Sequence, residues 1–186
     1  AHLFKAETAQ KLGALARQAQ ATYAADPASL GEALGLSPAL AAQVHPKLVA
    51  KLAREPVEDL RIDFEDGYGH RGDDEEDAHA LGAGEQYAKA AREVLLPAFS
   101  GLRIKPLSAE LRARALRTLE LFLSRAAPTR TLLLTLPQVT SVAQVELLVG
   151  EVAKAEARHG LPAGLVRLEL MVEASQSLFD GQGRAL

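Results

Sequence analysis

Residues 60–66 read LRIDFED, in which apolar and charged side chains alternate without interruption over residues 60–65. Successive side chains of a β-strand point to opposite faces, so this pattern predicts a strand over residues 59–64 with one apolar and one charged face. A parallel sheet is normally covered on both faces by apolar side chains, whereas a barrel strand can turn one face toward a polar opening. The charged face of this strand is therefore the first indication of where the chemistry lies.

Strands and helices are expected to alternate on the C-terminal side of this stretch. Further strands are predicted at residues 102–105, 131–136 and 166–172, and helices at 74–96, 109–126, 141–159 and from 174 onward. This order is typical of a parallel sheet with crossover helices, either doubly wound or closed into a barrel of the TIM type. No Gly-x-Gly-x-x-Gly follows the first strand, which argues against a dinucleotide site.

The N-terminal third is expected to be helical. Residues 4–25 are rich in Ala, Leu, Gln and Lys, which favour helix. Asp26-Pro27 then begins a short helix that Gly35 ends, and Ser37-Pro38 begins another that runs to about Arg54. We therefore divide one α/β domain, residues 1–186, into a helical segment over 1–56 and βα repeats over 57–186.

Polar side chains gather where the predicted strands end. They follow the four strands in turn: Glu65 and Asp66, Arg103 and Lys105, Gln138, and Glu173. Parallel α/β folds place their chemistry at the carboxyl ends of the strands, which lie together at one edge of the sheet. We therefore expect these side chains to form one site.

The residue types at these positions suggest a class of chemistry. Carboxylates in a chain without cysteine suit a hard divalent cation, Mg²⁺ or Mn²⁺. The guanidinium of Arg103 suits bidentate recognition of a carboxylate. A metal and an arginine together are what a lyase needs to hold a 2-oxo acid and stabilise its enolate.

Four segments resemble, in the same order, the HpcH/HpaI aldolase and citrate lyase β-subunit family. Residues 61–69, RIDFEDGYG, resemble its Asp-x-Glu-Asp segment, and residues 101–105, GLRIK, resemble the strand that carries its substrate-binding Arg. Residues 134–139, LTLPQV, and 170–175, LMVEAS, resemble its next two strands. The resemblance runs from about residue 4 to the end and is closest to an uncharacterised branch with Asp-Phe-Glu-Asp-Gly-Tyr-Gly.

This resemblance implies a (β/α)₈ TIM barrel of the phosphoenolpyruvate/pyruvate superfamily. Such a barrel needs about 250 residues, so the chain is expected to cover roughly its first half to two thirds. The resemblance also implies a divalent metal, Mg²⁺ or Mn²⁺, held by Glu173 and by an Asp expected beyond Leu186.

The resemblance assigns roles to the other candidates. Arg103 is expected to contact substrate and enolate oxygens, and Glu65 and Asp66 are expected to be catalytic, near metal-bound water. Gln138 is expected to bind substrate, although many relatives carry Lys there. Ala174 follows the metal-binding Glu where relatives often carry Thr.

The leading functional hypothesis is a metal-dependent carbon–carbon lyase, of the aldol or Claisen type, that acts on a 2-oxo acid or an acyl-CoA-like substrate. A CoA thioester is accordingly one of the substrates considered. One alternative is a non-catalytic α/β binding or assembly module with an incomplete site. Another is a related Mg²⁺ enzyme that breaks a C–O or P–C bond.

Composition narrows the classes of partner. Lys and Arg number 21 and Asp and Glu 24, a net charge of −3, which argues against a broad nucleic-acid-binding face. No apolar run approaches the roughly 20 residues that span a bilayer. A cytoplasmic protein that binds a small-molecule substrate and forms a homo-oligomer is expected. The acidic run over residues 73–77 is interpreted as the solvated start of a helix.

Overall fold

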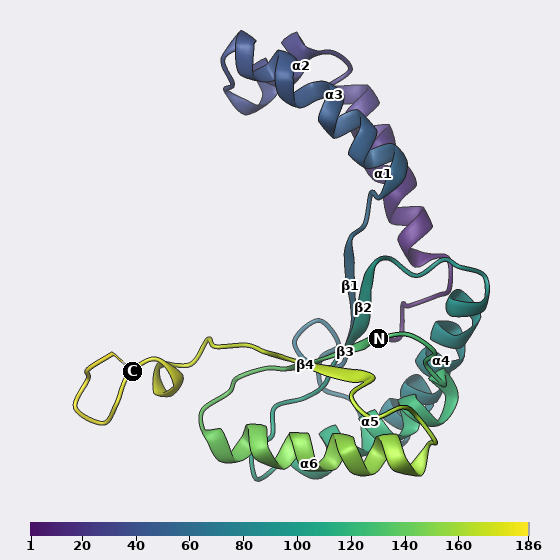
Figure 1. Ribbon diagram of the computed structural model, residues 1–186, viewed down its shortest axis with the longest axis vertical. Coiled ribbons are helices and arrows are strands. Elements are labelled where there is room, and N and C mark those ends of the chain that lie inside the picture. Colours follow the sequence, from purple (N-terminus) through teal and green to yellow (C-terminus); the bar gives the residue numbers. More distant parts are fainter. Residues whose placement is uncertain (186) are drawn as a thin grey trace. The chain divides into compact units, whose positions relative to one another are not determined.

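The computed structural model describes residues 1–185, which divide into two compact units (Figure 1). The smaller unit is Glu7–Asp59, and the larger joins Ala1–Ala6 to the chain from Leu60 onward. Every site residue predicted within the described chain belongs to the larger unit.

The smaller unit consists of α1 (Thr8–Tyr23), α2 (Pro27–Leu34) and α3 (Pro38–Arg54). The Asp26 carboxylate accepts a hydrogen bond from the Ser29 backbone N–H at 2.8 Å and caps α2. Gly35, in the left-handed conformation with φ 64°, ends that helix. The predicted starts of α2 and α3, each with proline in the first turn, are confirmed.

The larger unit is built on a four-stranded parallel sheet. Its strands are β1 (Asp59–Asp63), β2 (Phe99–Arg103), β3 (Leu132–Leu136) and β4 (Val166–Leu170). They lie in the order β1-β2-β3-β4, and the register places Arg103, Thr135 and Glu169 side by side. The mixed α/β class and the predicted alternation of strands and helices are confirmed.

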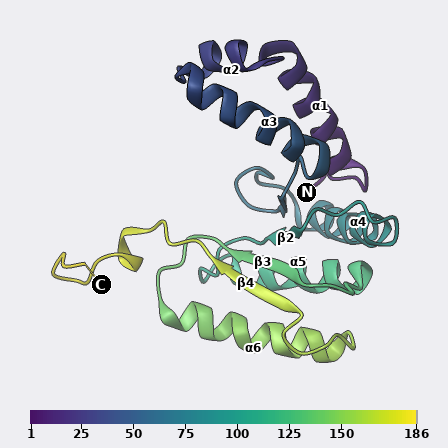
Figure 2. The ribbon, with the colours of Figure 1, turned by 45° about the horizontal axis from the view of Figure 1, so that its top comes forward.

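The crossover helices α4 (Asp73–Arg92), α5 (Arg112–Ala126) and α6 (Val142–Arg158) lie along one face of the sheet (Figure 2). Right-handed crossovers between sequential parallel strands put their helices on one side in this way. The core between the layers contains the strand side chains Ile62, Leu102, Leu134 and Val166 and, from the helices, Tyr87, Phe122, Leu123 and Leu148.

The opposite face of the sheet carries polar side chains. Alternation puts Arg61 and Asp63 of β1 on this face, with Arg103, Thr135 and Glu169 of the next three strands. Hydrogen bonds across the strands join Arg103 to Asp63. A second set joins Arg61, Thr135 and Glu169. The sheet is therefore apolar toward its helices and ionic on its other side.

Several predicted elements are shorter in the structure, as α4 and β4 are at their C-terminal ends, and two differ for reasons that the structure shows. The second strand was expected to begin at Leu102 but begins at Phe99, because Gly101 pairs closely with Leu133. A Cβ on Gly101 would lie 1.7 Å from the Leu133 carbonyl oxygen, so the glycine permits the strand rather than breaking it. The helix expected from residue 174 is a single 3₁₀ turn, Ser175–Ser177, followed by a turn that the Asp180 carboxylate caps.

Replacing Gly84 with alanine is expected to destabilise the larger unit by about 1–3 kcal/mol, because α4 and α5 approach closely there. The added Cβ would lie 2.6 Å from the Phe122 carbonyl oxygen and 2.9 Å from the Arg125 Cβ. Gly82→Ala is the matched control, since it adds a methyl group to the same helix with nothing within 4 Å. Urea unfolding should show that only Gly84→Ala lowers stability; equal effects would contradict the close packing.

Candidate functional site

Arg103 at the end of β2 is clamped by Asp63 at the end of β1. Its Nε and Nη2 each donate a hydrogen bond of 2.7 Å, to Oδ1 and Oδ2 of Asp63 respectively. Its Nη1 lies 3.4 Å from Glu65 Oε2 and 4.0 Å from the Met171 sulfur. The side of the guanidinium that was expected to bind a ligand carboxylate is thus occupied by Asp63, and the Nη1 end points toward Glu65.

Asp63 also orders the turn that follows β1. The backbone N–H groups of Glu65 and Gly67 donate to its carboxylate at 2.9 and 2.7 Å. Burial acts to raise the pKa of Asp63, but the hydrogen bonds from Arg103 and from these two amides, with the charge of Arg103, lower it overall. Asp63 therefore stays ionised beside the arginine.

The side chain of Glu65 is buried within the turn and takes part in the same cluster. Gln138 Nε2 donates a hydrogen bond to its Oε1 at 3.0 Å, and only 7% of the side chain is exposed. Burial raises the pKa of Glu65, the neighbouring Asp66 carboxylate adds to the rise, and Arg103 opposes it. A raised pKa makes this carboxyl group a better proton acceptor than an ordinary surface carboxylate.

Gln138 links the ends of three strands. Its backbone N–H donates to Glu173 Oε1 at 2.9 Å while its side chain reaches Glu65. Its φ of 51° places it in the left-handed region, which costs a non-glycine residue about 1–3 kcal/mol and is common at functional sites. The structure therefore brings together Glu65, Arg103, Gln138 and Glu173, as the strand-end argument predicts. The expectation that Lys105 joins them is wrong, because its ammonium group pairs with Glu76 instead.

Asp66 lies at the edge of this cluster. Its side chain is exposed, and its charge raises the pKa of both Glu65 and Arg103. For Arg103 the hydrogen bonds to Asp63 are the larger cause of the raised pKa.

The residues of this cluster fit a divalent metal ion in part. Carboxylate oxygens are the right donors for Mg²⁺ or Mn²⁺, and Glu173 is exposed with one oxygen hydrogen-bonded to Gln138. Across residues 1–185, however, no group of three or more His, Cys, Asp or Glu side chains is placed to hold a metal ion. The described residues thus fit the chemistry of such an ion but supply only part of a ligand set.

A second ion pair lies on the same polar face, between residues of β1 and β4 that precede the ends of those strands. Arg61 donates from Nε to Glu169 Oε2 at 3.1 Å and from Nη2 to Oε1 at 3.2 Å. The Thr135 hydroxyl contacts both of these residues. The hydrogen bond from Thr135 has the largest effect on the pKa of Glu169 and lowers it. Burial acts in the opposite direction, and the charge of Arg61 lowers the pKa further.

On the helix side of the sheet lies a buried ionic cluster that the sequence analysis did not predict. Glu76 of α4 is 1% exposed, and its two carboxylate oxygens accept from Lys105 Nζ and Thr118 Oγ1, each at 2.7 Å. Lys105 also donates to the Phe64 carbonyl oxygen at 2.8 Å. The interpretation of residues 73–77 as a solvated run is therefore wrong for Glu76.

The neighbouring Asp77 is also poorly exposed, at 17% of its side chain, and pairs with Arg114 and Arg117 of α5. The acidic run thus fastens α4 to α5. A signal for this was present in the sequence, because Ala80, Ala83 and Tyr87 form a buried helical stripe. One turn back along that stripe is Glu76.

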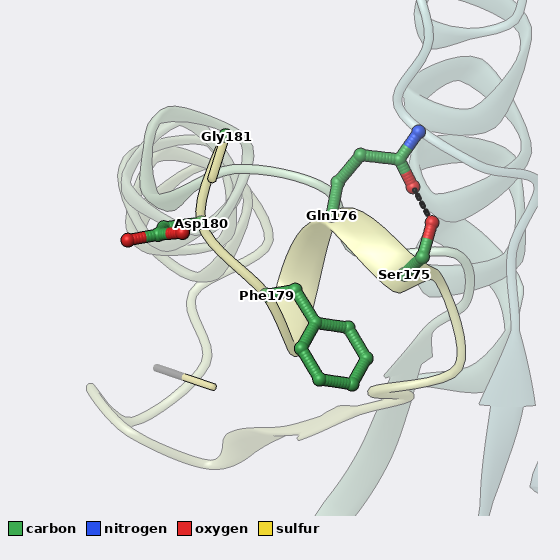
Figure 3. A pocket seen from close by; sticks show the side chains of 5 residues that line it. All are labelled: Ser175, Gln176, Phe179, Asp180 and Gly181. Carbon is green, nitrogen blue, oxygen red and sulfur yellow. Dashed lines mark hydrogen bonds between the residues drawn. The ribbon is translucent and has the colours of Figure 1, made fainter. Parts of the chain in front are cut away.

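Pockets add little to the strand-end cluster. One pocket lies in the C-terminal segment and is lined by Ser175, Gln176, Phe179, Asp180 and Gly181 (Figure 3). Figure 3 shows the hydrogen bond that the Ser175 hydroxyl donates to the Gln176 side-chain oxygen. Asp180 is paired with Arg184. Another pocket lies between the first turns of α4 and α5, where Glu76, Lys105 and Arg114 line it.

In the part of the chain that the structure covers, no helix is both long and apolar enough to cross a membrane.

Comparison of the sequence with known proteins identifies the family to which the chain belongs. No curated protein and no solved structure matches the sequence. Residues 1–186 match a family described as a domain of unknown function, DUF6986, and the chain therefore belongs to the DUF6986 family.

Proposed function

We propose that this chain carries the substrate-binding residues of a divalent-metal-dependent carbon–carbon lyase, of the aldol or Claisen type, acting on a 2-oxo acid or an acyl-CoA-like substrate. The observation that carries the proposal is the oriented guanidinium of Arg103 beside the buried Glu65 carboxyl at the strand ends. One side of that guanidinium is held by Asp63, and its Nη1 end points toward Glu65.

In this proposal Arg103 binds the oxygens that become negatively charged. Its Nη1 would donate to the carboxylate of a 2-oxo acid and, as the carbon–carbon bond breaks, to the developing enolate oxygen. Donors that are already oriented stabilise such a charge without reorganising during the reaction. Gln138, on the neighbouring strand end, would contact the substrate with its amide.

Glu65 would move the proton. Its Oε1 accepts from Gln138, while its Oε2 lies on the side of Arg103 Nη1. In the cleavage direction Oε2 would take the proton of the substrate hydroxyl as the bond breaks, and would later return a proton to the enolate carbon. The raised pKa of Glu65, caused mainly by burial, suits a group that must both accept and release a proton. Asp66 would keep that pKa high.

Mg²⁺ or Mn²⁺, when bound, would polarise the substrate carbonyl as a Lewis acid. Glu173 would supply one of its ligands, with Gln138 fixing the Glu173 carboxylate through the 2.9 Å hydrogen bond from its backbone N–H. A hydrogen bond from an outer residue to a metal ligand orients that ligand toward the ion.

Mn²⁺ is expected to bind the wild-type chain, and Glu173→Gln should weaken that binding by more than the roughly tenfold that loss of an outer partner costs. Titration calorimetry or the EPR signal of free Mn²⁺ measures this directly. Glu146→Gln is the control, because Glu146 is an exposed carboxylate on α6. Equal Mn²⁺ binding by Glu173→Gln and Glu146→Gln would argue against Glu173 as a metal ligand.

We further propose that the sheet forms four strands of a (β/α)₈ barrel. The sequential parallel order of the strands and the helices along one face are features that such a barrel requires. β4 is an edge strand and ends at the exposed Leu170, so it suits pairing with a further strand or with a second copy of the chain. A homo-oligomer in the cytoplasm, with a small-molecule substrate, completes the proposal.

A non-catalytic binding module is the competing reading, and one observation favours it. The charged side chains on the polar face are already paired within the chain, Arg103 with Asp63 and Arg61 with Glu169. Ion pairs of this kind can hold a scaffold together without any reaction. Turnover of a 2-oxo acid that depends on Arg103 would separate the two readings.

A further inference from the structure

We infer that Asp63 is a positioning residue, which fixes Arg103 and the turn carrying Glu65 as one unit. The inference concerns contacts within the chain, and its link to a reaction rests on the function proposed above. The resemblance described above assigned no role to Asp63, although Asp63 is the first residue of the Asp-x-Glu-Asp segment.

Four hydrogen bonds converge on the Asp63 carboxylate in a regular pattern. Oδ1 accepts from Arg103 Nε at 2.7 Å and from the Glu65 amide at 2.9 Å. Oδ2 accepts from Arg103 Nη2 and from the Gly67 amide, both at 2.7 Å. Each oxygen therefore joins one guanidinium nitrogen of β2 to one backbone amide of the turn after β1.

This pattern links the two groups that the proposed reaction needs. A bidentate pair fixes the plane of the guanidinium as well as its distance. The same carboxylate fixes the backbone from which the Glu65 side chain leaves, so Nη1 of Arg103 and Oε2 of Glu65 are held 3.4 Å apart. Removing the carboxylate charge would release both groups, although neither would be altered chemically.

Gly67 provides independent evidence that the turn is shaped around Asp63. A Cβ on Gly67 would lie 2.6 Å from Asp63 Oδ2, closer than real Cβ contacts. The φ of Gly67 is not in the left-handed region, so the glycine serves to admit the carboxylate rather than to permit an unusual backbone. Gly67→Ala therefore perturbs Asp63 without removing any hydrogen-bonding group.

Asp63→Asn tests the inference in the full chain. The amide keeps the size of the carboxylate but replaces one acceptor with a donor facing Arg103. Solvent exchange of the Arg103 Nε–H, measured by nitrogen-15 NMR, should become about tenfold faster, since a hydrogen bond between charged groups is lost. Glu169→Gln is the matched control, because Glu169 pairs with Arg61 on the same face and should leave Arg103 unchanged. Gly67→Ala should shift the Arg103 signal in the same direction.

Ligand binding separates positioning from a merely structural role. With pyruvate as the probe in Mg²⁺ buffer, Asp63→Asn should weaken binding about tenfold in wild type and not at all in an Arg103→Lys background. An equal loss in both backgrounds, or unchanged exchange of the Arg103 Nε–H, would overturn the inference. Wild type that fails to bind pyruvate would contradict the proposed function, while the exchange measurement would still decide the role of Asp63.

Discussion

Glu76→Ala is expected to lower the free energy of unfolding of the larger unit by about 3–5 kcal/mol, because it leaves the Lys105 ammonium buried without its carboxylate partner. Lys105 would keep its hydrogen bond to the Phe64 carbonyl and its place over the Tyr68 ring but would have no carboxylate partner, and Thr118 would lose its acceptor. Arg114, whose side chain is 10% exposed and whose Nε lies 3.5 Å from Glu76, would lose an opposite charge as well. The melting temperature should fall by roughly 10 °C.

Glu75→Ala is the matched control for this result. Glu75 lies next to Glu76 on α4, but its side chain is 50% exposed and pairs only with Arg71 one turn away. Surface pairs of this kind contribute about 0–1 kcal/mol. Circular dichroism melts of the two variants would therefore differ widely. A similar small effect in both would mean that the buried cluster contributes little to stability.

Arg103→Lys is expected to lower kcat/KM for 2-oxo-acid cleavage by roughly 10²–10³-fold, the loss that follows removal of one oriented donor to an oxyanion. Lysine keeps the positive charge beside Asp63, so the pair survives in part. It cannot both satisfy the two Asp63 oxygens and present a second nitrogen toward Glu65, as the guanidinium does. Release of pyruvate, coupled to NADH oxidation by lactate dehydrogenase, measures the rate.

Arg61→Lys is the control for that measurement. It makes the same replacement on the same face of the sheet, at a residue that pairs with Glu169 and Thr135 instead of the strand-end cluster. Cleavage should be nearly unchanged in this variant. Turnover that is equal in Arg103→Lys and wild type would remove Arg103 from the reaction and favour the non-catalytic binding module.

Local patterns were enough to predict most of the architecture. The alternation over residues 60–66 predicts β1 and its ionic face, and the Asp-Pro, Ser-Pro and glycine signals predict α2 and α3 nearly to the residue. The start of β2 was missed because Gly101 is a strand breaker by propensity. Gly101 belongs to the strand because it lets the backbone of Leu133 approach closely. Leu133 lies 32 residues away, so the sequence around Gly101 does not indicate this contact.

The candidate site was predictable in position but not in connectivity. Placing polar residues at the ends of parallel strands brings Glu65, Arg103, Gln138 and Glu173 together correctly. Which carboxylate would hold Arg103 depends on the register of β1 against β2, and a sequence does not state register. The burial of Glu76 was missed for another reason, since its acidic neighbours hid its place on the apolar stripe of α4.

Each strand of the sheet pairs with the strand synthesised just before it. On the ribosome, β1 can therefore pair with β2 while β3 and β4 are still being made, because the strand that pairs with β1 is the next one along the chain. Because paired strands belong to neighbouring βα units, their sequence separation is shorter than it would be if distant strands paired, and the contact order is lower. At each stage the newest strand forms one edge of the nascent sheet, and through β4 the next strand to emerge is the one that covers that edge.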